Sequence, residues 1–258
     1  MAIGEYYLDR TARAVNQLEG NLIRIMFGWT MAMSFACGLR LAFAATPIHG
    51  MAEYAALGSL YALVVAAPIA SAFLALRWFR DGGAMPQPEI RLARIGRWRA
   101  VPREEARSMR YFGTNGIMFS LLIGMLLNIP VRSGEFLLAI PAAGSGTPDW
   151  YPPLFRLMLA DVVIFSSLYA IAFVAALRHV PLFPRLLVAI WGVDLAMQLG
   201  IAQVMSQMPD LPRGVAAGLG AVLDGNIKKV LISAALWAPY LLLSRRVNLT
   251  YRSRAPLD

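Results

Sequence analysis

Two carboxylates lie inside long apolar stretches of the sequence, where a charge is costly. Asp194 is near the middle of the apolar run 186–205, and Asp161 lies about two turns inside the run 154–177. Gln198 follows Asp194 at i+4, which places its amide on the same helix face. A charged side chain near the centre of a membrane helix costs about 2.5–3.5 kcal/mol on insertion scales. We therefore expect these side chains to face the interior of a bundle and to have polar partners.

Two interpretations of these carboxylates remain open. In the first, which we favour, Asp161 pairs with a nearby arginine or lysine and Asp194 is held by polar neighbours, so that both fix helix packing. In the second, Asp194 is a proton or cation site with Asp161 at its outer entrance, because a low-dielectric environment favours the protonated carboxyl. The cationic candidates lie near the ends of apolar runs: Arg40, Arg156, Lys228 and Lys229.

The motifs of common soluble enzymes are missing from the sequence. There is no G-x-x-x-x-G-K-[ST], no H-E-x-x-H and no G-x-S-x-G. The single cysteine, Cys37, lies in an apolar run, so neither an intramolecular disulfide nor a cysteine metal cluster can form. His49 and His179 are predicted on opposite sides of a membrane. We expect no metal and no cofactor, and the sequence does not favour an enzyme.

The composition indicates the elements that hold these residues. The 258-residue chain is 58% hydrophobic and 15% charged, whereas a soluble domain is nearer 45–50% apolar and about 25% charged. The apolar excess is concentrated in runs, and about 20 mostly apolar residues are needed to cross a bilayer as a helix. Six stretches predict transmembrane helices: 22–44, 55–76, 112–129, 154–177, 186–205 and 227–243.

The positive charges indicate an orientation. The chain has a formal net charge of +9, and its arginines flank alternate ends of the apolar runs. They gather in the first 24 residues, in the loop 77–110, in the link 178–185 and in the tail 245–254. Cytoplasmic loops carry such an excess, so we expect both termini to face the cytoplasm. This pattern favours a partner bilayer with anionic headgroups over nucleic acid.

The basic loop 79–110 has helical spacing between two prolines, Pro88 and Pro102. Apolar residues at i, i+3 and i+6 alternate there with arginines: Leu92, Ile95 and Trp98 beside Arg91, Arg94 and Arg97. The pattern predicts an interfacial amphipathic helix that lies on the headgroups. A solvated charged loop is the alternative.

The end of the chain carries a motif, W-x-P-Y-x-x-x-S-x-R-V-x-x-T-Y. It is formed by Trp237, Pro239, Tyr240, Ser244, Arg246, Val247, Thr250 and Tyr251. This motif resembles the C-terminal signature of a bacterial family of four-helix membrane proteins of unknown function, in which the last residue is usually Phe. The stretches "GTNGIMFSLLIGMLLNIP" and "LFPRLLVAIWGVDL" resemble the opening and third helices of that family. The resemblance covers residues 111–254 and implies a membrane fold without implying an activity.

The spacing of this motif exceeds what a membrane anchor requires. Trp237 and Tyr240 suit the membrane interface, and Pro239 is expected to bend the last helical turns. An anchor does not need Ser244 and Tyr251 at fixed spacing, so we predict that the tail docks against the bundle.

The predicted fold is an all-α integral membrane bundle of about six transmembrane helices with both ends inside. Residues 1–110 are expected to form an N-terminal two-span extension with a basic loop, and residues 111–258 a four-span membrane domain. We expect an accessory or assembly subunit that binds a membrane-protein partner or a second copy of itself. The alternative is a small-solute or proton-coupled transporter that uses the intramembrane carboxylates.

Overall fold

The structure is a computed structural model that describes residues 2–89 and 96–257. Within them, five helices are long and apolar enough to cross a bilayer: α2 (Leu22–Ala42), α3 (Gly50–Trp78), α5 (Ile117–Ala139), α6 (Tyr151–Leu177) and α7 (Phe183–Ser206). A sixth span is formed by α8 (Arg213–Leu243) when it is taken with α9 (Arg245–Arg252), which is bent from it by 70°. The prediction of an all-α bundle of about six spans is confirmed.

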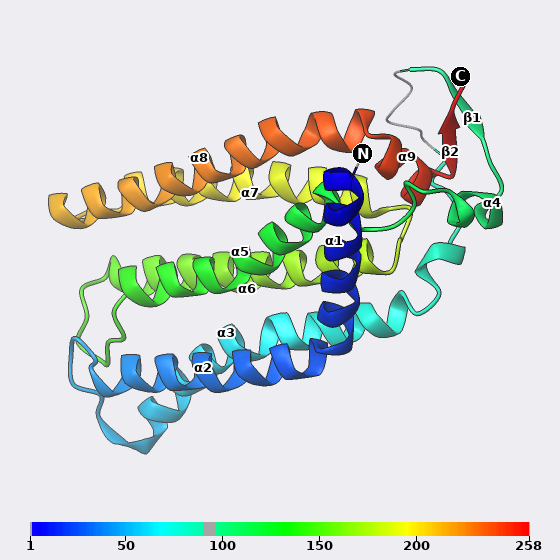
Figure 1. The fold of residues 1–258 in the computed structure, drawn as a ribbon. Helices are drawn as coiled ribbons and strands as arrows, with labels where there is room; N and C mark the ends of the chain where they lie inside the picture. Colours follow the sequence, from blue (N-terminus) through cyan, green and yellow to red (C-terminus); the bar gives the residue numbers. More distant parts are fainter. Residues whose placement is uncertain (1, 90–95, 258) are drawn as a thin grey trace.

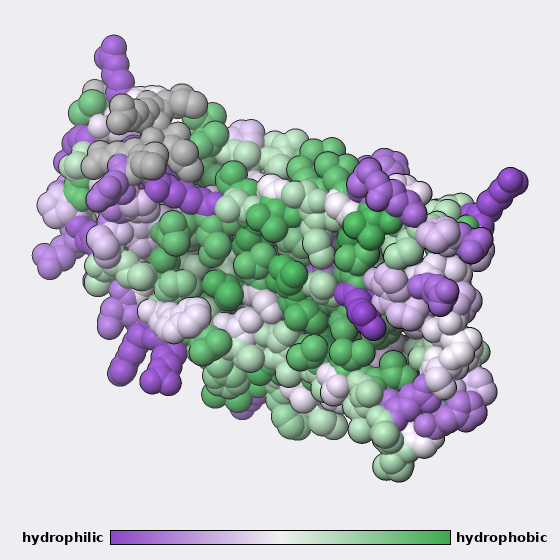
Figure 2. Space-filling model, turned by 180° about the vertical axis from the view of Figure 1, so that it is seen from behind, coloured by the Kyte–Doolittle hydropathy of each residue, from purple (hydrophilic) through white to green (hydrophobic). Residues whose placement is uncertain are grey.

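The long helices lie side by side in three pairs (Figure 1). The pair α5 and α6 lies between the pair α2 and α3 and the pair α7 and α8, and α6 contacts α3, α5 and α7. The other spans leave large apolar side chains exposed, among them Phe35 in α2 and Leu236 in α8. Viewed from behind, hydrophobic residues gather around the middle of the molecule and hydrophilic residues mostly at its ends (Figure 2). Lipid-facing flanks require this distribution.

The short elements and both termini lie at one end of the bundle, which we call the terminal end (Figure 1). There α1 (Ala2–Gly20) runs across the ends of the long helices. The 3-10 turn η1 (Gly82–Ala84) and α4 (Arg103–Ser108) follow α3 along the chain. Strand β1 (Trp98–Ala100) pairs antiparallel with β2 (Arg254–Pro256), so the tail and the basic loop are joined.

The predicted amphipathic helix between Pro88 and Pro102 is wrong in its second half. Arg91 and Arg94 lie outside the described residues, but Trp98 opens β1 and Arg97 precedes it in an extended segment. The reason is the partner strand, which the local pattern does not reveal. The carbonyl of Arg97 accepts from the N–H of Leu257 at 3.0 Å, and Gly96 adopts a φ of +92° that breaks a helix.

Two helix boundaries also differ from the predicted ones. α5 continues through Pro130 to Ala139, although the third run was predicted to end at Ile129. α8 begins at Arg213, fourteen residues before the predicted start at Ile227. In a membrane the helix satisfies its backbone internally, and the bond lost at a proline is tolerated. Arg132 follows the predicted end of the third run at residue 129 and was therefore expected in the outer loop after it, but it lies inside α5.

The two predicted parts of the chain share their hydrophobic cores. Near the terminal end Ala75 of α3 packs in one cluster with Phe165 of α6. Toward the opposite end Tyr61 of α3 packs against Phe136 of α5 and Phe155 of α6, with ring centroids 6.1 and 5.9 Å away. Residues 1–110 therefore complete one bundle with the rest of the chain.

Candidate functional site

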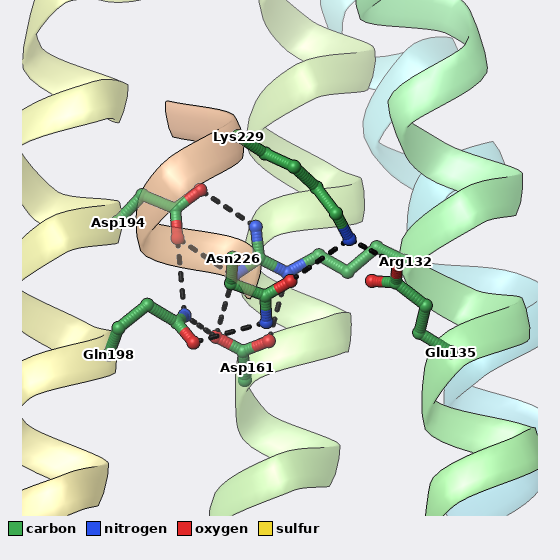
Figure 3. Close-up of polar contacts among 7 residues, drawn as sticks. All are labelled: Arg132, Glu135, Asp161, Asp194, Gln198, Asn226 and Lys229. Atoms are coloured by element: carbon green, nitrogen blue, oxygen red, sulfur yellow. Dashed lines mark hydrogen bonds and ion pairs between the residues drawn. The ribbon is translucent and has the colours of Figure 1, made fainter. Parts of the chain in front are cut away.

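The centre of the bundle contains a buried ion-pair network built around Arg132 (Figure 3). Its Nε and Nη2 donate to the two carboxylate oxygens of Asp161 at 2.9 and 2.8 Å. Its Nη1 and Nη2 also donate to those of Asp194 at 2.7 and 2.8 Å. The guanidinium lies 4.2 Å above the ring centroid of Phe165. One side chain of α5 thus links α6 and α7 through four charge-assisted hydrogen bonds.

The network continues into α8 through amides. The Nε2 of Gln198 donates to Asp161 at 2.7 Å and to Asp194 at 3.2 Å. The Nδ2 of Asn226 donates to the Oε1 of Gln198 at 3.2 Å. Helical spacing positions these groups, because Gln198 is one turn after Asp194 and all of them face the space between α6, α7 and α8.

A third ion pair, between Lys229 and Glu135, connects the network to the outside of the bundle. The Nζ of Lys229 donates to the Oδ1 of Asn226 at 3.3 Å and to the carboxylate of Glu135 in α5. The Lys229 side chain is 48% exposed and the Glu135 side chain 35% exposed, whereas that of Asp194 is fully buried. The polar chain therefore runs from the flank between α5 and α8 to the bundle centre (Figure 3).

The charges of this network do not balance. Two cations, Arg132 and Lys229, face three carboxylates, Asp161, Asp194 and Glu135, which leaves one net negative charge. A void of about 30 Å³ lies beside Asp194 and Lys229, and the buried Oδ1 of Asn128 in its wall has no hydrogen-bond partner among the described residues. A space of this size and polarity suits one water molecule. The arrangement can hold helices together and can also accept one proton.

The other predicted candidates do not join the network. The Nε of Arg40 donates to the carbonyl of Ile140 at 3.3 Å, and Arg156 is exposed on α6. Lys228 pairs with Asp224 one turn earlier on α8, at 2.5 Å, with side chains 68% and 59% exposed. Because α8 begins at Arg213, Lys228 and Lys229 lie at mid-helix and not at the start of a span as predicted.

The sequence analysis missed the central residue of the network. Arg132 was assigned to an outer loop because Pro130 seemed to close the third span. One signal was present in the sequence, since the run 112–129 is short for a transmembrane helix and its extension brings Arg132 inside. Asn226 and Glu135 were missed for the same kind of reason, because both lie in stretches assigned to loops.

The tail motif docks at the terminal end. The hydroxyl of Tyr251 donates to the carbonyl of Ala176 at 2.9 Å, and Tyr251 is fully buried. The Nη1 of Arg246 donates to the side-chain oxygen of Asn115 and to the carbonyl of Phe112 at 3.3 Å. The N–H of Gly113 donates to the hydroxyl of Thr250 at 2.9 Å. The tail thus closes over the segment that leads into α5.

The bend before the tail lies at Ser244 and not at Pro239. The helix α8 continues through Pro239 to Leu243, and Ser244 adopts an extended backbone between α8 and α9. The Nδ2 of Asn248 donates to the carbonyls of Ser244 at 3.0 Å and Leu242 at 3.2 Å. These bonds satisfy carbonyls at the end of α8, as a helix end requires. Trp237 packs edge-on against Tyr240, with ring centroids 5.8 Å apart.

The same segment holds α1 in place. Gly116 has a φ of +65°, and a Cβ there would lie 3.1 Å from the side chain of Leu8. Its N–H donates to the hydroxyl of Thr11 at 2.8 Å. A glycine is needed at this position both for its backbone conformation and for the close approach of α1.

No group of three histidine, cysteine, aspartate or glutamate side chains that could hold a metal ion occurs among the described residues. Comparison of the chain with family models, with curated proteins and with solved structures finds no match. Any inference about function therefore depends on the fold and on the ion-pair network.

Proposed function

We propose that the protein is an accessory subunit of a bacterial inner-membrane complex, which binds a membrane partner along the outward face of α8. The observation that carries this proposal is the exposed ion pair between Asp224 and Lys228. The arginine asymmetry of the sequence supports the inner-membrane location and the cytoplasmic assignment of the terminal end.

The exposed charges of α8 lie deep within the span. Asp224 is roughly 16 Å from the start of α8 at Arg213, and Lys229 is roughly 21 Å from its end at Leu243, at 1.5 Å per residue. Asn226 bonds to buried Gln198, so these charges share the depth of the network. Charged side chains at such a depth face other protein or a water-filled cavity and not lipid.

A partner helix with polar groups at the same depth would cover this face. It would remove Asp224 and Lys228 from hydrocarbon and supply hydrogen bonds, which in membranes are worth about 0.6 kcal/mol each on average. The buried network suits such a role because it links α5, α6, α7 and α8 and keeps the docking face in a fixed position.

The test is copurification from the native host in mild detergent. Wild-type protein is expected to retain a stoichiometric membrane partner or a second copy, and a double variant with Asp224→Leu and Lys228→Leu is expected to lose it. Phe35→Ala, an exposed change on α2, is the matched control and should retain the partner. If the double variant retains as much partner as the wild type, the outward face of α8 is not the binding surface.

A second candidate function rests on a different observation. The unbalanced negative charge and the void beside Asp194 favour a proton-coupled carrier, in which one proton joins the network as solute moves. A purified protein that is monomeric without a partner, and whose melting temperature rises with one solute, supports the carrier over the subunit.

A further inference from the structure

A basic hollow of about 300 Å³ lies at the terminal end, separate from the ion-pair network. Three arginines from three parts of the chain line it. Arg80 follows α3, Arg107 belongs to α4 and Arg178 caps α6. Its other ionisable lining residues are Glu19, Asp81 and His179. The charge pattern of the sequence predicts these arginines on the cytoplasmic side, at the level of the headgroups.

Among the described residues, the three guanidinium groups have no ionic partner. Within residues 2–89 and 96–257, no carboxylate oxygen lies within 4.0 Å of their nitrogen atoms, although Glu19 and Asp81 line the same hollow. The three arginines exceed the two lining carboxylates by one positive charge, so the hollow favours a bound anion.

His179 lines the hollow beside Arg107 and Arg178. The pKa of its imidazole is lowered to about 4, mainly by burial and in part by the charges of Arg107 and Arg178. His179 also lines a smaller hollow together with Arg103 and again Arg107. The charged residues that share these two hollows with His179 are therefore four arginines and the two carboxylates of Glu19 and Asp81.

The walls of the hollow are tightly packed. A Cβ at Gly82 would lie 2.7 Å from the carbonyl oxygen of Arg178 and 2.7 Å from Val180, so η1 is pressed against the link between α6 and α7. The His179 ring packs edge-on against Phe112 and Tyr251, with centroids 5.1 and 6.3 Å away. The docked tail thus supports the wall that carries the histidine.

We propose that this hollow binds a phosphate group, carried either by a lipid headgroup or by a soluble phosphate. Arginine recognises phosphate through its planar fork of donors, and three arginines line a volume sufficient for a small headgroup. An apolar hollow of about 320 Å³ includes Val174, one turn of α6 from Leu177 in the basic hollow. An acyl chain could lie there, so we expect the lipid to be the source.

The two histidines of the chain allow a direct measurement. Protein with isotope-labelled histidine gives two imidazole signals, and His49 serves as the internal control because it lies before α3 at the opposite end. We expect a bound phosphate group to raise the pKa of His179 by about one unit or more, because a nearby anion favours the imidazolium. The His49 signal should not change.

Two arms distinguish the sources of phosphate. In one, inorganic phosphate is titrated into the protein solubilised in a detergent without phosphate groups; in the other, that solubilised protein is compared with protein in nanodiscs containing phosphatidylglycerol, without free phosphate. If the pKa of His179 rises only with phosphatidylglycerol, the site binds a lipid headgroup. If it rises only with inorganic phosphate, the site binds a soluble ligand. If the pKa of His179 rises in neither arm, the proposal is overturned.

Variants test whether the arginines form the site. Arg107→Gln and Arg178→Gln, singly and together, should reduce or abolish the response of His179 to the anion. Arg110→Gln is the matched control, because Arg110 is exposed and pairs with Glu5 outside the hollow. All three arginines are exposed, so if the double variant does not fold, the single variants and Arg80→Gln provide the measurement. The proposal is also overturned if the anion raises the pKa of His179 as much in all of these variants as it does in Arg110→Gln.

Discussion

Arg132 and Asp161 form a bidentate ion pair between α5 and α6, with N–O distances of 2.9 and 2.8 Å. The same guanidinium holds Asp194 of α7, so its removal leaves two carboxylates without their main partner. A buried ion pair is weak evidence for stability in itself, but the loss of one member is costly because the charge left behind has no compensation.

We expect Arg132→Leu to lower the free energy of unfolding by about 3–5 kcal/mol, the range for breaking a buried pair. Arg132→Lys should be intermediate, because an ammonium cannot reproduce four bonds in a planar fork. The measurement is thermal and denaturant unfolding in one detergent. Arg156→Leu, an exposed change on α6, is the control, and equal effects of the two leucine variants contradict the assigned role of Arg132.

The substitution Asp194→Asn separates packing from proton binding. An amide keeps the shape and most hydrogen bonds of Asp194 while it removes the charge that leaves the network net negative. If the carboxylate only packs, the variant should associate normally and complement a deletion strain in cells. Asp194→Leu should then lose bonds worth about 0.6 kcal/mol each on average.

The paired readout for Asp194→Asn is a detergent melt together with complementation. Normal complementation rules out a carrier that depends on titration of Asp194. Loss of complementation with an unchanged melt would instead overturn the packing role and support the carrier.

The sequence was informative where a signal is local. Apolar runs of bilayer length predicted the spans, and a carboxylate within such a run predicted a buried polar site around Asp161 and Asp194. The i+4 spacing placed Gln198 beside Asp194, as the structure does. These inferences need only one helix and its periodicity.

The sequence was misleading where the answer depends on a partner segment. Pro130 has the appearance of a helix end, yet α5 passes through it and brings Arg132 to two carboxylates more than 25 residues away. Trp98 has helical spacing, yet it pairs with the tail strand across 158 residues. Neither contact has a local signature, so only the assembled fold reveals it.

The tail prediction can be tested at a single hydroxyl. Tyr251→Phe keeps the buried ring and removes only the donor to the carbonyl of Ala176. We expect the free energy of unfolding to fall by about 0.5–1.5 kcal/mol, the net contribution of one hydrogen bond, because the Ala176 carbonyl still accepts from the N–H of His179 at 3.1 Å. Tyr6→Phe, at an exposed position on α1, should have no effect in the same unfolding assay.

The orientation predicted from the arginines can be tested with reporters. An enzyme active only in the periplasm should be active when it is fused after Ser145, in the link between α5 and α6, and inactive when it is fused after Asp258. Activity of the C-terminal fusion would reverse the orientation and would place the basic hollow on the outer side.

The last prediction concerns the pH dependence of stability through His179. Its pKa is lowered to about 4 in the folded protein, against 6.5 for a free imidazole. Between these values the unfolded chain binds a proton that the folded chain does not, so this residue lowers stability as the pH falls from 6.5 toward 4. Each pKa unit corresponds to 1.36 kcal/mol, which gives a loss of about 3 kcal/mol across the window.

The comparison variant for this effect is His179→Asn, because asparagine tolerates the positive φ of 52° at this position. The variant loses the ring contacts and should be less stable at pH 7.5, but its stability should change less between pH 6.5 and 4 than that of the wild type. Carboxylates that titrate in this window contribute to both proteins and cancel in the difference. Denaturant unfolding in phosphate-free buffer at each pH gives the slope of the free energy of unfolding against pH for each of the two proteins. Parallel slopes would mean that burial and the neighbouring arginines do not lower the pKa of His179 in the folded protein.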